Sequence, residues 1–128
     1  MRLNHIGINC LDIEQTKDFF IKYFEAQEVA KYHNPKTGLH SRILVFPMGS
    51  TRLELMSWPD AISAERQTHR QGMAHLSMSV GSQEMVNTLT QQLEADGYQR
   101  LSGPRTTGDG YYESCFLGPE NMEIEITI

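Results

Sequence analysis

Apolar and polar residues alternate along several short segments of the chain, and this two-residue period predicts half-buried β-strands. The segments with this pattern are 4–8, 41–46, 52–56, 74–78, 111–117 and 122–128, and two further strands are expected at 29–31 and 98–101. Between them lie two segments whose apolar residues recur at helical spacing. These residues are Phe19, Phe20, Tyr23 and Phe24 in the first segment and Val86, Leu89 and Leu93 in the second.

The pattern occurs twice along the chain. A shift of 70 residues brings His5 onto His75, and a shift of 71 brings Glu54 onto Glu125, each within an alternating run. Both halves therefore predict the order β-α-β-β-β. We expect an α+β fold in which two βαβββ modules, about 1–58 and 72–128 with a linker at 59–71, form a single domain.

Local signals mark where the helices begin and end. Asp12 and Ser82 are good N-caps, Gln15 can close a capping box with Asp12, and Gly97 is a typical stop for the second helix. The linker has room for a short helix. Three glycines in and just before the segment 104–110 predict a loop there.

Composition excludes some functions. The 128-residue chain carries a formal net charge of −5, which argues against a surface for nucleic acid or anionic membranes. None of its apolar runs approaches the roughly 20 residues that cross a bilayer. The N-terminus shows no secretory apolar region, and the two cysteines, Cys10 and Cys115, are expected to be buried thiols. These features predict a cytoplasmic protein.

The candidate chemistry lies on the polar faces of the predicted strands. Strand parity places His5, Glu54, His75 and Glu125 opposite the apolar residues of their own strands. A lone strand histidine is more often structural, and a lone glutamate is usually solvated, but the shared register of all four favours a metal site. Glu123 shares a face with Glu125 and is an alternative ligand. The remaining histidines, His33, His40 and His69, lack this register.

Two imidazoles and two carboxylates are a mixed nitrogen and oxygen set. Such a set suits divalent Zn, Ni, Co, Mn or Fe. Four protein ligands leave two octahedral positions for water or a bidentate small-molecule substrate. A metal in this position can polarise a carbonyl and stabilise an enediolate, while a glutamate removes the adjacent proton.

These residues resemble the vicinal oxygen chelate superfamily, which includes glyoxalase I, bleomycin-resistance proteins and extradiol dioxygenases. The resemblance covers essentially the whole chain. It is carried by the runs 4–8, 11–14, 53–55, 72–76 and 118–126 with Phe19 and Phe20. It implies that two βαβββ modules form an eight-stranded open barrel around a divalent metal, and that the protein is a homodimer.

Within that superfamily, a His-Glu-His-Glu set looks most like glyoxalase I. The resemblance implies metal ligands at His5, Glu54, His75 and Glu125, with Glu125 or Glu54 as the base that moves a proton between adjacent carbons. The alternatives are another metalloenzyme, such as an epimerase or an extradiol-type dioxygenase, and a non-enzymatic drug- or metabolite-binding protein.

The chain also departs from glyoxalase I. The segment 55–59 lacks the asparagine that follows the glutamate motif and helps bind glutathione, and a counterpart of the glutathione-carboxylate arginine is missing. The resemblance therefore implies the four metal ligands, but it does not imply glutathione as the thiol of the substrate.

Overall fold

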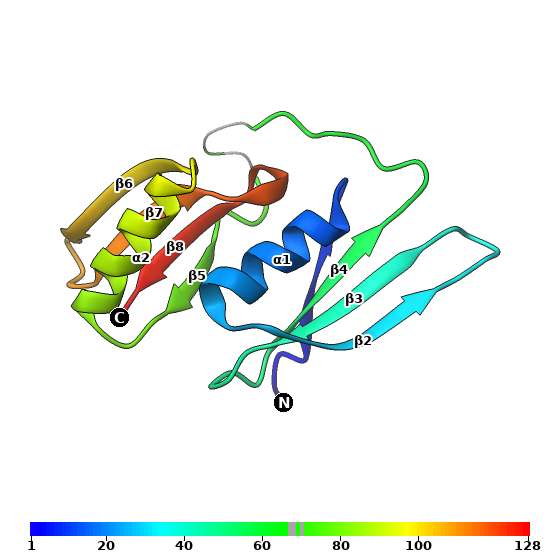
Figure 1. Cartoon of the computed structure of the whole chain (residues 1–128), viewed down its shortest axis with the longest axis horizontal. Helices are drawn as coiled ribbons and strands as arrows, with labels where there is room; N and C mark the ends of the chain where they lie inside the picture. Colours follow the sequence, from blue (N-terminus) through cyan, green and yellow to red (C-terminus); the bar gives the residue numbers. More distant parts are fainter. Residues whose placement is uncertain (67–68, 70) are drawn as a thin grey trace. The chain divides into compact units, whose positions relative to one another are not determined.

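The structure, a computed structural model, describes residues 1–66, 69 and 71–128 (Figure 1). Its internal contacts divide the chain into two compact units, 1–64 and 65–128. Each unit contains a four-stranded mixed sheet and one long helix in the order β-α-β-β-β. This confirms the predicted α+β fold of two βαβββ modules. Among the described residues, no helix is long and apolar enough to span a membrane.

The first unit contains five elements. They are β1 (His5–Asn9), α1 (Ile13–Phe24), β2 (Gln27–His33), β3 (His40–Val45) and β4 (Arg52–Ser57). The strand order is β1-β4-β3-β2, with β1 parallel to β4 and the other pairs antiparallel. The first and last strands of the unit are therefore direct neighbours, which brings β1 beside β4.

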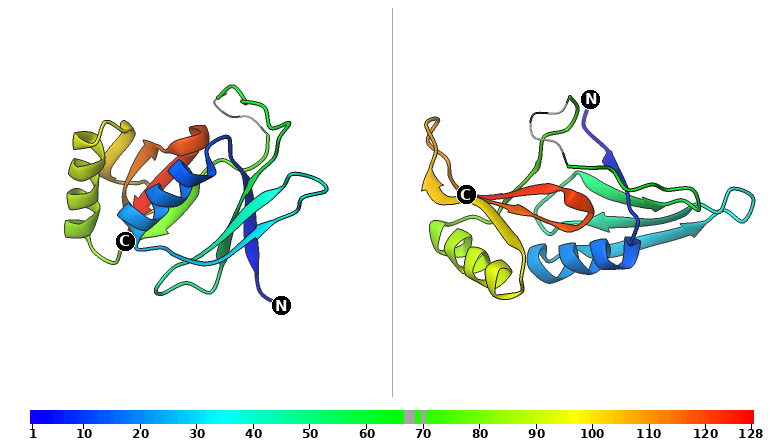
Figure 2. Two further views of the ribbon diagram at one scale, coloured as in Figure 1. Left: turned by 45° about the vertical axis from the view of Figure 1, so that its right-hand side comes forward. Right: turned by 90° about the horizontal axis from the view of Figure 1, so that it is seen from above.

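The second unit repeats this arrangement. Its elements are β5 (Leu76–Ser79), α2 (Gln83–Ala95), β6 (Gln99–Thr106), β7 (Tyr112–Leu117), a 3₁₀ turn (Pro119–Asn121) and β8 (Glu123–Thr127). The strand order is β5-β8-β7-β6, again with the first and last strands parallel. Each helix packs on one face of its own sheet (Figure 2).

Burial follows strand parity in both units. Leu53 and Leu55 of β4 are buried on the helix side, as are Ile124 and Ile126 of β8. The aromatic stripe of α1 supplies much of the first core, because Phe19, Phe20, Tyr23 and Phe24 are all buried. Polar side chains such as Glu54 and Glu125 lie on the opposite faces of these strands.

The predicted helix caps are confirmed. The Asp12 carboxylate accepts a hydrogen bond from the backbone N–H of Gln15 at 2.9 Å, and the Ser82 hydroxyl accepts one from Met85 at 3.2 Å. These bonds satisfy N–H groups that have no partner within the first helical turn. α2 ends just before Gly97, which adopts φ +89°, a left-handed conformation that favours glycine.

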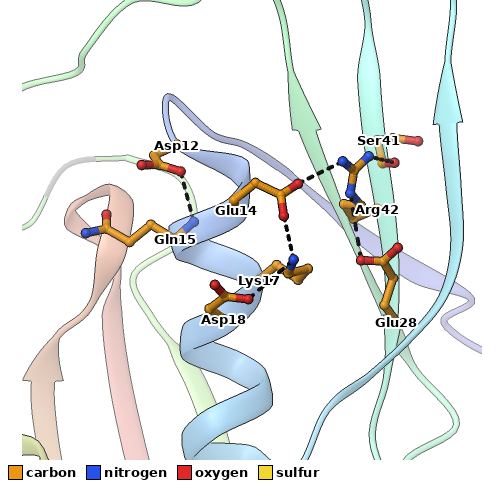
Figure 3. Close-up of polar contacts among 8 residues, drawn as sticks. All are labelled: Asp12, Glu14, Gln15, Lys17, Asp18, Glu28, Ser41 and Arg42. Carbon is orange, nitrogen blue, oxygen red and sulfur yellow. Dashed lines mark hydrogen bonds and ion pairs between the residues drawn. The ribbon is translucent and has the colours of Figure 1, made fainter.

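An ion-pair network joins α1 to the sheet of the first unit (Figure 3). Glu14 accepts hydrogen bonds from Lys17 and from Arg42 of β3, the latter at 2.7 Å, and Arg42 also approaches Glu28 at 3.7 Å. The hydrogen bond from Lys17 is the largest effect that lowers the pKa of Glu14, and Arg42 adds to it against an opposing effect of burial.

Replacing Glu14 with glutamine is expected to lower the free energy of unfolding at pH 7 by about 0.2–1 kcal/mol, the range of exposed ion pairs. Glu84→Gln is the matched control, because Glu84 holds the same first-turn position on α2. Since the folded-state pKa of Glu14 is lowered, its contribution exists above the ordinary value of 4.5 and disappears as the pH falls through the lower folded value. Urea unfolding at pH 7 and pH 3 measures this. If both variants lose the same free energy of unfolding at pH 7, the ion-pair network contributes nothing to stability.

Two local expectations need correction. The segment predicted as a loop at 104–110 begins later, because β6 continues through Pro104 to Thr106. β6 is an edge strand with register breaks, which is where a sheet tolerates a residue without an N–H group. The short linker helix is not found in the described residues 59–66, 69 and 71, while 67, 68 and 70 lie outside the described residues.

The cysteines are as expected. Cys10 and Cys115 are both buried thiols, and neither forms a disulfide with a described residue. Burial, and then the nearby carboxylates Glu123, Glu125 and Glu113, raise the pKa of the Cys115 thiol to about 11. Cys115 therefore stays protonated at neutral pH and adds no negative charge to its surroundings.

Candidate metal centre

The first half of the candidate centre lies where β1 meets β4. His5 is the first residue of β1 and pairs with Arg52, and Gly7 pairs with Glu54. Parity directs His5 and Glu54 to the face opposite α1. The Nε2 atom of His5 lies 3.5 Å from Oε2 of Glu54, with about half of the imidazole and a quarter of the carboxylate side chain exposed.

The second half repeats this geometry where β5 meets β8. His75 lies immediately before β5 rather than within it, and Ser77 pairs with Glu125. The Nε2 atom of His75 lies 3.2 Å from Oε2 of Glu125. The alternative ligand Glu123 is engaged elsewhere, since its Oε1 accepts a hydrogen bond from Arg66 at 2.6 Å.

The structure thus brings the four predicted residues together as two pairs, one in each unit. Among the described residues of either unit, no group of three or more histidine, cysteine, aspartate or glutamate side chains could hold a metal by itself. Each pair supplies two of the four predicted ligands, and we refer to it as a half-site.

The donor spacing within each pair fits a metal ion. Nitrogen and carboxylate ligands lie about 2.0–2.2 Å from Zn²⁺, so two ligands at octahedral or tetrahedral angles are about 2.8–3.5 Å apart. The observed separations are 3.5 Å for His5 and Glu54 and 3.2 Å for His75 and Glu125. Neutral imidazole and carboxylate also form the nitrogen and oxygen set that borderline divalent metals accept.

Glu113 is a further carboxylate beside the second pair. It lies on β7 two residues from Cys115, which pairs with Glu125, so the three residues share one sheet face. Burial, and then the negative charge of Glu125, raise the pKa of Glu113, and Arg105 at 4.0 Å opposes this effect. The alternation of residues 111–117 predicted the strand that carries Glu113. Its position beside Glu125 depends on the pairing of β7 with β8.

The same face of the first unit continues away from His5 as an apolar wall. Met56 covers Gly7, where an added Cβ would lie 2.9 Å from the methionine methyl group. The indole N–H of Trp58 donates to Asn9 at 3.1 Å, which fixes the ring beside the end of β1. An imidazole, a carboxylate and the apolar side chains of Met56 and Trp58 thus occupy one sheet face.

Comparisons with known proteins cover nearly the whole chain. A family model described as Glyoxalase/Bleomycin resistance protein/Dioxygenase superfamily matches residues 2–126. The uncharacterized protein YwkD of Bacillus subtilis (strain 168) is 26% identical over 131 residues, which span 97% of this chain and 94% of that protein.

Solved structures of other proteins share the fold. The trypanothione-dependent glyoxalase I of Leishmania major superposes with a TM-score of 0.79 at 19% identity, covering 99% of this chain and 86% of that one. A mutant of the fosfomycin resistance protein FosX of Listeria monocytogenes, in complex with Mn(II) and 1S,2S-dihydroxypropylphosphonic acid, gives 0.76 at 18% identity, with coverages of 98% and 90%. At these identities the likeness establishes the fold alone.

Proposed function

We propose that this chain, which belongs to the glyoxalase/bleomycin resistance protein/dioxygenase superfamily, is a metal-dependent lyase or isomerase of the glyoxalase I type. His5, Glu54, His75 and Glu125 would hold one divalent metal ion. The observation that carries the proposal is the pair of His–Glu contacts at 3.5 and 3.2 Å, each with the spacing of two ligands on one ion. Mn(II) in the FosX complex supports a divalent ion in this fold.

The proposed reaction moves a proton between adjacent carbons of a small α-oxo thiol adduct. A divalent ion at this centre would supply positive charge to the oxygens of the enediolate. The chain itself must take the proton from one carbon and return it to the next, which is the work of a carboxylate.

We assign this proton transfer to Glu125. Arg52 pairs with His5 and places a cation beside the first half-site. Glu113 and Glu123 instead place carboxylates on the sheet face that carries Glu125. Glu125 thus has carboxylates on its own sheet face, whereas an arginine stands beside the first half-site. Glu54 is the alternative base.

The thiol of the adduct need not be glutathione. The glyoxalase I of Leishmania major is named for trypanothione, so enzymes of this type differ in their thiol. The apolar wall at Met56 and Trp58 offers contacts to the non-reacting part of a substrate.

The test is turnover of methylglyoxal hemithioacetals by metal-loaded protein. Glutathione and several smaller thiols should be tried with Ni²⁺, Zn²⁺, Co²⁺ and Mn²⁺ in turn. Turnover with at least one combination is expected, and the absence of turnover with all of them would remove this function. Elemental analysis of the native protein separates the dioxygenase alternative, which requires iron, and tight metabolite binding that survives His5→Ala and His75→Ala would favour a binding protein.

A further inference from the structure

Asn4 contacts the imidazole of His5 on the side of the ring opposite Glu54. Asn4 lies just before β1, and its Oδ1 atom contacts Nδ1 of His5 at 2.9 Å. The same oxygen accepts a hydrogen bond from a terminal nitrogen of Arg52. The backbone N–H of Arg52 also donates to the Asn4 carbonyl oxygen at 3.2 Å. Arg52 therefore holds both the main chain and the amide of Asn4.

This arrangement determines which nitrogen of His5 carries the proton. A guanidinium group only donates hydrogen bonds, so the amide oxygen of Asn4, and not its NH₂ group, must face Arg52. That oxygen also faces Nδ1 of His5 and can only accept. Nδ1 must therefore carry hydrogen, and in the neutral ring the lone pair is left on Nε2, which points at Glu54.

The second half-site lacks this arrangement. The residue before His75 is Ala74, whose side chain offers no acceptor. The position that matches Arg52 is occupied by Glu123, which pairs with Arg66. The two halves of the duplicated centre thus differ in the support given to their histidines.

We propose that Asn4 and Arg52 are positioning residues that lock His5 in its Nδ1–H tautomer and so prepare the first half-site for a metal ion. In that tautomer the Nε2 lone pair faces a carboxylate oxygen at 3.5 Å, so both atoms are free to bind one metal ion. The lock is specific to His5, because Ala74 precedes His75 and offers no side-chain acceptor. This inference rests on the proposed metal role of His5.

The test reads the tautomer directly in metal-free protein. Imidazole ¹⁵N shifts at about pH 8.5, where ordinary histidines are neutral, distinguish Nδ1–H from Nε2–H. Wild-type protein should show Nδ1–H at His5, and Asn4→Ala should release this preference, while His75 stays unchanged as the internal control. Metal affinity, measured by competition with a chelator, should fall about 10- to 100-fold in Asn4→Ala, the usual cost of losing a partner that orients a ligand.

Two conservative variants separate this role from a general effect on folding. Asn4→Asp keeps an acceptor and should retain the tautomer and an affinity close to that of the wild type. Arg52→Met frees the Asn4 amide to rotate and should weaken the preference at His5. A wild-type His5 in the Nε2–H form, or an Asn4→Ala affinity within about twofold of wild type, would overturn the proposal. A failed hemithioacetal assay with the expected tautomer and affinity would count only against the proposed reaction.

Discussion

Glu125→Gln is expected to lower kcat for the hemithioacetal by about 10²- to 10⁴-fold, the contribution of a general base. The amide oxygen of glutamine can still occupy a coordination position, but the side chain cannot take up the substrate proton. KM should change much less than kcat, because the substrate still binds to the metal and the apolar wall. Steady-state kinetics on protein with measured metal content checks this.

Two variants are compared with Glu125→Gln. Glu123→Gln removes a carboxylate from the same strand and the same face, but one that pairs with Arg66, and it should leave kcat within a fewfold of wild type. Glu54→Gln removes the matching carboxylate of the first half-site. If Glu54→Gln loses more activity than Glu125→Gln, the base has been assigned to the wrong half-site.

His75→Ala is expected to reduce affinity for the divalent ion by more than the 10- to 100-fold that loss of an orienting partner costs, because a direct ligand disappears. His5→Ala should have a comparable effect. Calorimetry or chelator competition measures both. His40→Ala is the matched control, since His40 stacks on His33 across the β2–β3 hairpin with ring centroids 4.1 Å apart. Metal binding that survives both His5→Ala and His75→Ala would contradict the proposed centre.

Mixing the His5→Ala and His75→Ala chains tests how the two half-sites combine. We propose a homodimer, in which a centre forms either from the two units of one chain or from units of two chains. If the half-sites come from different chains, a mixed dimer contains one intact centre and regains activity. If each chain builds its own centre, mixing restores nothing.

Most of the fold could be predicted because its signals are local. Alternation over a few residues identified the strands, and aromatic residues at helical spacing identified α1. The caps Asp12 and Ser82 bond to backbone N–H groups only three residues away. The course of β6 through Pro104 was missed, because only the position of a strand in the sheet shows whether an N–H group is needed there.

The residues of the candidate centre could also be predicted from local signals, but their contacts across strands could not. Parity assigns each residue to a face of its own strand, so the common face of His5 and Gly7, or of Glu54 and Met56, follows from the order of the letters. The contact of Asn4 with Arg52 joins residues that are 48 positions apart in the chain, and the position of Glu113 beside Glu125 depends on the register between β7 and β8. No local pattern encodes them.

The choice between Glu123 and Glu125 shows where the two kinds of information divide. Both residues stand on one face of β8 because they are two positions apart, and the duplicated pattern alone places them on the polar side. The pairing of Ser77 with Glu125 and the position of Arg66 leave Glu125 beside His75 and Glu123 in an ion pair. Alternation within a strand is a property of neighbouring residues, whereas register between strands is settled by packing and hydrogen bonding across the whole sheet.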